Sequence, residues 1–245
     1  MHHAFSVMFL PKDTNRQKID KLDIYISDKE NYRLTEDNFG NRKFYGLIEK
    51  THDRFEVIVS GEVQTGLDIC EEFTLNPFAY SFLKAQTALT QPGEKIKEYH
   101  KSLELEKLTG DYDKALCAMN TLHYTFAYDT EATAVHETAE NALALGRGVC
   151  QDYAHIMLSL LRMEGIPARY VVGMMTGEGS SHAWVEALCN GYWYGFDPTN
   201  NKLVNADYIR VSCGRDSADC SVIRGNFYGC VTQRQNEKVV VEKDE

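Results

Sequence analysis

The stretch from residue 146 to 164 constrains this chain most, because it puts a cysteine where a glycine-containing turn becomes a buried helix. It reads GRGVCQDY and continues into an apolar-periodic segment. From Ala154 the apolar residues recur at i, i+3, i+4 and i+7, which predicts one buried helical face. Gly165 and Pro167 predict where the helix ends. The sequence therefore predicts a helix with Cys150 at its N-terminus.

A helix N-terminus favours the thiolate form of Cys150. The first N–H groups of a helix have no partner inside it, and the helix dipole adds about half a positive charge there. The same N–H groups can stabilise an oxyanion if the sulfur attacks a carbonyl. A free cysteine is more often a buried structural residue. The nucleophile hypothesis therefore needs a base and a group that orients the base.

Two strand-like runs downstream, SHAWVEALC and YWYGFD, supply candidates for both groups. An Asn-Gly pair joins them, which is a strong hairpin signal. If Cys189 pairs with Tyr192, Trp184 lies opposite Asp197. His182 and Asp197 are then diagonal neighbours with Cβ atoms about 7 Å apart or less, a gap that a hydrogen bond can close. Each residue alone also fits a structural role, as a surface histidine or as the aspartate of an Asp-Pro strand end.

Other residues around the cysteine are expected to support the site. Trp184 shares a strand face with His182 and is expected to pack against the imidazole, while Gly148 and Gln151 are expected to line or support the cleft. Asp152 lies in the first helical turn, where a carboxylate is stabilised by the dipole, and is interpreted as structural. His155 is displaced from the Cys150 face by about 140° and is not expected to be the base.

These residues resemble the core of the bacterial transglutaminase-like family, a branch of the papain-like cysteine enzymes. The runs that carry the resemblance are GRGVCQDYAHIMLSLLRMEGIPARYVVG, SHAWVEA and YWYGFDPTNNK. The resemblance implies a Cys-His-Asp triad, which carries over to Cys150, His182 and Asp197. It extends over residues 74–245, but the tail departs from the family pattern at Ser217 and at 220–221.

The first 73 residues predict a small antiparallel β domain. Runs rich in β-branched and aromatic residues alternate with polar, turn-rich stretches such as 28–40. Strands are expected at 5–10, 22–26, 43–48, 54–61 and 67–73. The resemblance agrees, because bacterial members of the family often carry a β-sandwich domain ahead of the catalytic one.

Residues 74–245 predict a catalytic domain. Helical spacing comes first, then strand-like runs and a loop at 176–181 that is expected to be flexible and to border His182. Helices are expected at 80–89, 94–108, 112–124 and 138–145, and a strand at 168–175. The predicted fold class is therefore α+β, with an antiparallel β domain followed by helices packed on an antiparallel sheet. The resemblance implies that the β domain is sandwich-like and that the second part is a papain-like, transglutaminase-like core.

Composition limits the possible partners and surroundings. The formal net charge of −10 and pI near 5.3 argue against nucleic acid and anionic membranes as partners. The seven cysteines form no C-x-x-C pair, which favours reduced thiols and a cytoplasmic location. We find no signal-peptide pattern or membrane-span run, and no close ligand pairs or phosphate-binding motif, so we expect neither metal nor cofactor.

The sequence thus predicts a cysteine-dependent enzyme that acts on amide or peptide bonds through a thioester. Hydrolysis of a peptide or protein substrate is favoured over acyl transfer to an amine, because transfer needs a further binding surface. An alternative of another class stays open, in which the fold is a binding or assembly module that retains the triad without turnover. The natural substrate, the second oxyanion donor and the oligomeric state are not determined by the sequence.

Overall fold

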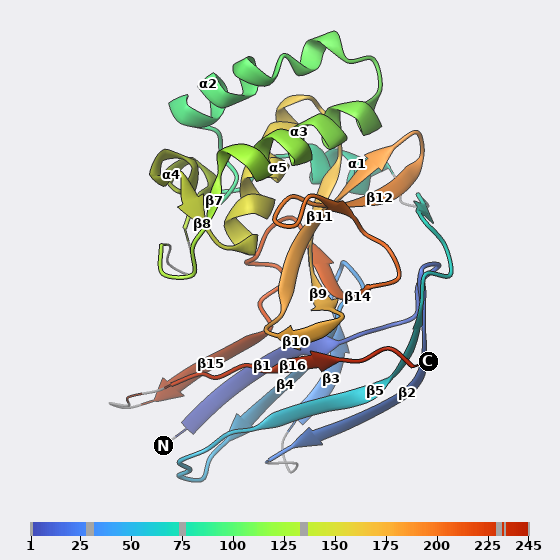
Figure 1. Cartoon of the computed structure of the whole chain (residues 1–245). Coiled ribbons are helices and arrows are strands. Elements are labelled where there is room, and N and C mark those ends of the chain that lie inside the picture. The colour runs from blue at the N-terminus through green and yellow to red at the C-terminus, as the bar shows by residue number, and fades with distance from the viewer. Residues whose placement is uncertain are drawn as a thin grey trace.

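The computed structural model describes residues 2–27, 32–73, 77–132, 137–228, 232 and 234–244 (Figure 1). The helices gather at one end of the molecule and the N-terminal strands at the other, with β9, β11 and β14 between them. The strands of the large sheets pair antiparallel. This agrees with the predicted α+β class.

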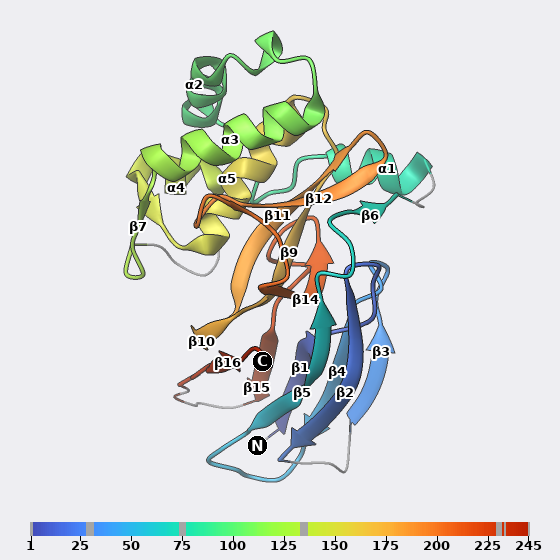
Figure 2. The same ribbon diagram turned by 45° about the vertical axis from the view of Figure 1, so that its right-hand side comes forward.

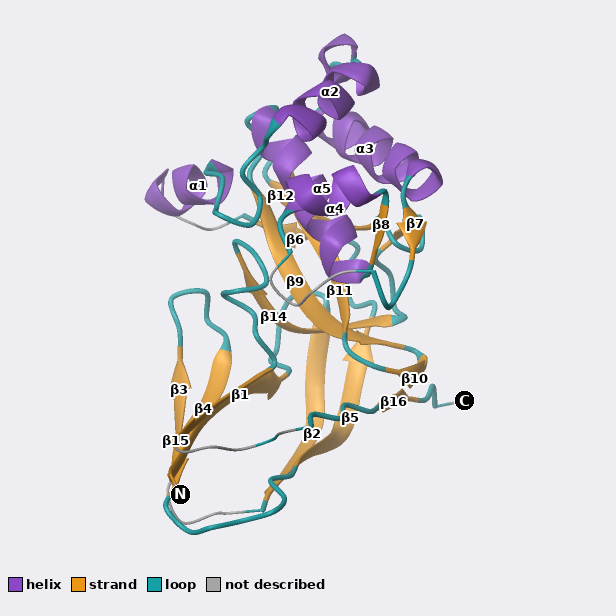
Figure 3. Ribbon diagram, turned by 90° about the vertical axis from the view of Figure 1, so that its left-hand side faces the viewer, coloured by secondary structure: helices purple, strands orange, loops and turns teal. Residues whose placement is uncertain are grey.

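The N-terminal strands form two facing layers (Figure 3). One layer is a four-stranded sheet in the order β15-β1-β4-β3, and the other is the β2-β5 ribbon. Their bounds are β1 His2–Leu10, β2 Gln17–Ile26, β3 Tyr32–Glu36, β4 Arg42–Ile48, β5 Val57–Thr65 and β15 Ile223–Tyr228. Phe5, Phe44 and Ile26 pack between the layers, so both strand sets bury their apolar faces against each other.

Two expectations for this region were wrong. The stretch 28–40 was expected to be turns, but it contains β3, which pairs with β4. Every residue of β3 is exposed, so this edge strand lacks the apolar alternation that signals a strand. The strand expected at 67–73 is reduced to β6, Glu71–Glu72, which pairs with β12 rather than with the N-terminal strands.

The predicted helices are present, but two of them have other bounds than expected. The first spans 77–84 instead of 80–89, and the second ends at 103 instead of 108. The helices are α1 Pro77–Lys84, α2 Glu94–Leu103, α3 Asp111–Thr125, α4 Ala139–Leu145 and α5 Cys150–Met163, with a 3₁₀ turn at Leu105–Lys107. Helix α2 ends early because Glu104 adopts a left-handed conformation (φ 48°) that closes the helix and starts the 3₁₀ turn. No helix among the described residues is both long and apolar enough to cross a bilayer.

A six-stranded sheet lies against helix α5 and positions the residues after it. Its order is β13-β12-β11-β9-β14, with β6 also paired to β12. The bounds are β9 Ala168–Met175, β11 His182–Cys189, β12 Tyr192–Asp197, β13 Lys202–Leu203 and β14 Tyr208–Gly214. Ala183, Val185 and Ala187 of β11 pack in one core with the apolar residues of α5. The opposite face of β11, with His182, Trp184 and Glu186, points away from α5.

The predicted hairpin register is confirmed. Cys189 pairs with Tyr192 and Val185 with Phe196, as the Asn-Gly turn requires. On the other side, His182 pairs with Gly173 of β9. A Cβ at Gly173 would lie 2.1 Å from the Ile209 carbonyl oxygen and 2.4 Å from the Trp184 ring, so this position accepts only glycine without displacement.

The sheets do not stop at the predicted domain boundary. β15 pairs with β1 although it lies far along the chain, and β6 pairs with β12 across residue 73 (Figure 2). The division into 1–73 and 74–245 therefore stays a prediction about folding units.

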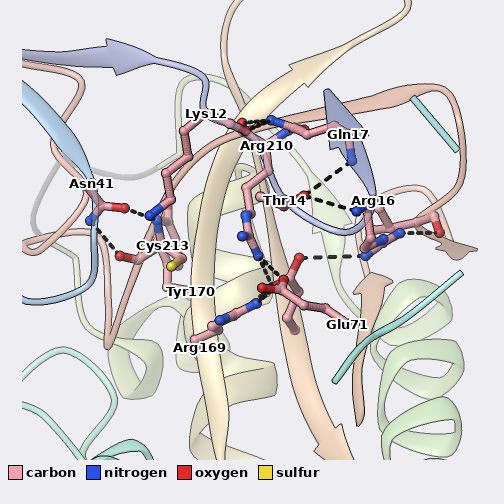
Figure 4. A network of polar contacts seen from close by, with 12 residues as sticks. Lys12, Thr14, Arg16, Gln17, Asn41, Glu71, Arg169, Tyr170, Arg210 and Cys213 are labelled. Atoms are coloured by element: carbon pink, nitrogen blue, oxygen red, sulfur yellow. Dashed lines mark hydrogen bonds and ion pairs between the residues drawn. The ribbon is translucent and has the colours of Figure 1, made fainter. Parts of the chain in front are cut away.

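Buried polar contacts join the N-terminal strands to the six-stranded sheet (Figure 4). Glu186 of β11 bonds Arg169 of β9 at 2.6 Å and Arg210 of β14 at 3.2 Å, and Arg16 lies 3.6 Å from it. Glu71 of β6 bonds the same two arginines at 3.0 and 2.7 Å. We call these five side chains the arginine–glutamate network.

Glu186→Gln is expected to destabilise the fold by about 3–5 kcal/mol at neutral pH. It leaves Arg169 and Arg210 with Glu71 as their carboxylate partner and takes the carboxylate partner of Arg16 away. Burial alone would raise the pKa of Glu186, but Arg169, Arg210 and Arg16 lower it from 4.5 to about 2. Its stabilising contribution is therefore complete above pH 4.5 and is lost as the pH falls through about 2.

Urea unfolding of wild type and variant between pH 7 and pH 2 measures this difference. The difference in free energy of unfolding between wild type and Glu186→Gln should become smaller as the pH falls from 4.5 to about 2. Glu178→Gln is the matched control, because its ion pair with Lys238 is exposed and is worth less than about 1 kcal/mol. Equal losses from the two substitutions at pH 7 would refute a stabilising role for the network.

Candidate active site

Cys150 is the first residue of helix α5, as the sequence predicts. Val149 before it is extended, and its backbone N–H donates to Asp152 Oδ2 at 2.8 Å. A Cβ at Gly148 would lie 2.3 Å from the same oxygen, so glycine is needed for this close approach. Asp152 and Gly148 thus fix the turn that presents Cys150. Gln151 is half-buried beside it, and its role in the cleft stays a prediction.

His182 and Asp197 form the predicted pair. His182 Nε2 lies 2.8 Å from Asp197 Oδ2, and the aspartate side chain is fully buried. Cys150 also acts on the imidazole, because a side-chain hydrogen bond and the charge of Cys150 are among the causes that raise the pKa of His182. The structure therefore brings Cys150, His182 and Asp197 together, whereas their catalytic roles stay a prediction.

The environment of His182 favours its charged form. Burial alone would lower the pKa of the imidazole, but hydrogen bonds with Asp197 and Cys150 and the charges of both raise it to about 10. For Asp197, burial acts to raise the pKa, and the bond and charge of His182 outweigh it and lower the pKa. At neutral pH the ring is therefore in its charged imidazolium form, hydrogen-bonded to the Asp197 carboxylate.

Asp197 is held by four further donors. The backbone N–H groups of Thr199 and Asn200 donate to Oδ1 at 3.0 and 3.2 Å. The side chains of Asn200 and Tyr208 donate to Oδ2 at 2.7 and 2.8 Å. Sequence reasoning missed both side chains. The Asp-Pro-Thr-Asn run is an Asx-type turn that could have indicated Asn200, but Tyr208 lies on β14 and requires knowledge of the sheet order.

Trp184 packs where the sequence places it. Its ring stacks on His182 at a centroid distance of 6.3 Å and meets Tyr208 edge-on at 5.4 Å. It is 1% exposed and occupies the space that Gly173 leaves open. The expectation that Trp184 supports the imidazole by packing agrees with these contacts.

His155 does not take part in the site. It is fully buried, and its Nε2 accepts a hydrogen bond from the Ser217 backbone N–H at 3.2 Å. Burial lowers the pKa of His155 to about 4. A neutral imidazole held inside the core has no access to a substrate, which fits the expectation that it is not the base.

Tyr128 is a neighbour of Cys150 that sequence reasoning missed. It lies on β7, Ala127–Tyr128, and pairs with Gly148 of β8, Arg147–Gly148. Desolvation and then the charge of Cys150 raise the pKa of its phenol. The Tyr128 side chain is 57% exposed.

The segment 176–181 is more structured than expected. Its β10, Gly177–Gly179, pairs with β16, Val239–Val241, near the end of the chain. The Ser181 backbone N–H also donates to Glu237 Oε1 at 2.6 Å. The expectation of an irregular loop was wrong here, because pairing with a distant tail leaves no local sequence signal. The expected flexibility of this segment stays a prediction. Within the described ranges, no group of three His, Cys, Asp or Glu side chains could hold a metal ion.

Comparison with known proteins gives the family context. Residues 100–198 match the family model of the transglutaminase-like superfamily. The uncharacterized protein ML0607 of Mycobacterium leprae is 34% identical over 165 residues, covering 63% of this chain and 55% of that protein. The uncharacterized protein Rv2569c of Mycobacterium tuberculosis is 32% identical over 139 residues, covering 50% and 43%. The chain thus spans about half the length of these curated relatives.

A solved structure shares the fold over almost the whole chain. The crystal structure of a "putative cysteine protease" from Cytophaga hutchinsonii superposes with a TM-score of 0.79, covering 99% of this chain and 86% of that one. The sequence identity is 22%, so the likeness establishes the architecture.

We expect an alkylating reagent to modify Cys150 faster than the other cysteines. At pH 6 iodoacetamide should modify Cys150 at least about tenfold faster than half-buried Cys70 and Cys117, because ordinary thiols are mostly protonated there. Burial raises the pKa of Cys189 to about 12 and that of Cys220 well above its usual value, so neither competes. Cys230 lies outside the described residues.

Peptide mapping by mass spectrometry measures the rates, with His182→Ala as the matched variant that removes the imidazolium. Equal labelling of Cys150, Cys70 and Cys117 in wild type would contradict an activated thiolate. That result would favour the binding-module alternative.

Proposed function

We propose that this protein is a cysteine-dependent enzyme that hydrolyses amide or peptide bonds through a thioester. The match of residues 100–198 to the transglutaminase-like superfamily supports this proposal. The observation that carries this proposal is the hydrogen bond between His182 and buried Asp197, on a ring whose pKa Cys150 also raises. A nucleophile, a base and an orienting carboxylate in that order are the parts that acyl transfer needs.

The first half of the reaction forms the thioester. The Cys150 thiolate attacks the carbonyl carbon, so an S–C bond forms and the carbonyl oxygen takes up the negative charge. The backbone N–H of Cys150, at the start of α5, stabilises this oxyanion. The C–N bond then breaks, and the His182 imidazolium gives its proton to the leaving amine.

The second half returns the enzyme to its starting state. Neutral His182 takes a proton from water, and the resulting hydroxide oxygen attacks the thioester carbon. The S–C bond breaks, the carboxylic acid leaves, and the thiolate and imidazolium are restored. Asp197 keeps one tautomer of the ring throughout and stabilises the imidazolium. An amine in place of water would give a new amide by the same steps.

We favour hydrolysis of a peptide or protein substrate over transfer to an amine, because transfer requires an additional binding surface for the acceptor. A cytoplasmic location, with reduced thiols, belongs to the same proposal. It is supported by six described cysteines that are all free.

A substrate screen tests the reaction type. Peptide and glutamine-amide substrates, each with and without an added primary amine, are incubated with wild type, Cys150→Ala and the control Cys117→Ala. We expect hydrolysis by wild type and by the control, and a loss of at least about a thousandfold in Cys150→Ala. Product made only in the presence of amine would replace hydrolysis by acyl transfer, and equal turnover by Cys150→Ala would reject both.

Asp197→Asn is expected to lower kcat by about ten- to a thousandfold on any substrate that wild type turns over. The amide group favours the wrong imidazole tautomer, although a preformed ion pair should suffer less than a serine triad, which loses about four orders of magnitude. The matched control is Asp207→Asn, whose carboxylate pairs with Lys243. If Asp197→Asn keeps full kcat/KM, another group must orient His182.

A further inference from the structure

Asp197 Oδ2 accepts more hydrogen bonds than a carboxylate oxygen has lone pairs. His182 Nε2, Asn200 Nδ2 and the Tyr208 hydroxyl lie 2.8, 2.7 and 2.8 Å from it. An sp² oxygen offers two lone pairs, so the three donors share the same electron density. Each added donor therefore reduces the charge that Asp197 can direct at the imidazolium.

Tyr208 is placed by the fold rather than by the turn that carries Asp197. It begins β14, which pairs with β9, whereas Asp197 ends β12, on the other side of β11. The phenol is 4% exposed, and the Trp184 ring meets it edge-on. Burial and then the charge of Asp197 raise the pKa of Tyr208, so its hydroxyl stays a neutral donor throughout the working pH range.

We propose that Tyr208 is a positioning residue that draws charge from Asp197 and thereby keeps the His182 imidazolium a good enough acid to protonate the leaving amine. This inference rests on the proposed acyl-transfer chemistry. Tyr208 touches neither the sulfur nor the scissile bond in that scheme, and acts through the carboxylate.

The charged and titratable neighbours do not supply an equivalent effect. Asp207, beside Tyr208, is the other acid that acts on the phenol, and its carboxylate pairs with Lys243. From α3, His123 Nδ1 bonds the Thr199 carbonyl oxygen at 3.0 Å rather than Asp197. Lys202 pairs with Asp197 in the β12–β13 register, and its side chain is exposed. In the part of the chain that the structure describes, the side chains that raise the pKa of His182 are Asp197 and Cys150.

Removing the Tyr208 hydroxyl should strengthen the hydrogen bond between the Asp197 carboxylate and the protonated His182 ring. In Tyr208→Phe the ring remains to pack on Trp184, while Oδ2 loses one of three donors. The carboxylate then binds the imidazolium more strongly, and proton release to a poor leaving group becomes harder. The effect should therefore depend on how much the leaving group needs a proton.

Two readouts test this. The first is the pH titration of the His182 ring by ¹⁵N NMR in the Cys150→Ala background, which removes one of the two partners that raise its pKa. Adding Tyr208→Phe should raise the titration midpoint of His182 by about half a pH unit or more.

The second readout is turnover of an amide and of a p-nitrophenyl ester with the same acyl group. The variant should lose about three- to tenfold on the amide and keep the ester rate within about twofold.

Two further variants complete the design. Tyr99→Phe removes a phenol that bonds Thr125 Oγ1 at 2.6 Å on the outer helices, and it should change neither readout. Asn200→Ala removes the other side-chain donor to Oδ2 from an exposed position, so it should raise the His182 midpoint even if Tyr208→Phe does not fold.

The outcomes separate this inference from the reaction on which it rests. An unchanged or lowered midpoint, or equal losses on amide and ester, would overturn the role of Tyr208 while leaving the triad chemistry in place. Wild-type rates in Cys150→Ala would reject the chemistry itself, and the NMR midpoint would still report whether Tyr208 draws charge from Asp197.

Discussion

The hydrogen bond between His182 and Asp197 depends on the register of a single hairpin. The Asn-Gly turn pairs Cys189 with Tyr192, and the ladder carries that register along β11 and β12 toward their far ends. There it leaves an imidazole nitrogen and a carboxylate oxygen 2.8 Å apart. A slip of one residue would turn every β11 side chain to the other face, so the geometry of the site follows from the turn.

Helix α5 provides the other half of the site through its packing. Its apolar residues share one core with Ala183, Val185 and Ala187. This packing fixes the N-terminus of the helix beside the start of β11, where His182 lies. The cysteine therefore needs no flexible segment to reach the imidazole. The close approach of Asp152 to Gly148 completes the turn into the helix and leaves the N-terminal dipole to act on the sulfur.

The sequence predicts those parts of the structure whose causes are local. The turn type gives the hairpin register, strand parity gives the packing of Trp184 on His182, and helical periodicity gives α5. Pairings between distant segments left no such signal: β3 is an exposed edge, β6 joins β12, and the glycine-rich β10 pairs with β16 from the tail. Tyr208 was missed for the same reason, because its contact with Asp197 requires the order of the whole sheet.

One face of β11 carries both His182 and a member of the arginine–glutamate network, Glu186. His182, Trp184 and Glu186 alternate along that face, and each is held by a different partner: Asp197, the Tyr208 ring, and the arginines of β9 and β14. The opposite face carries only apolar residues against α5. A register slip would bury Glu186 in that apolar core without its arginines, at a cost of several kcal/mol. The arginine–glutamate network therefore enforces the register that the hydrogen bond between His182 and Asp197 requires.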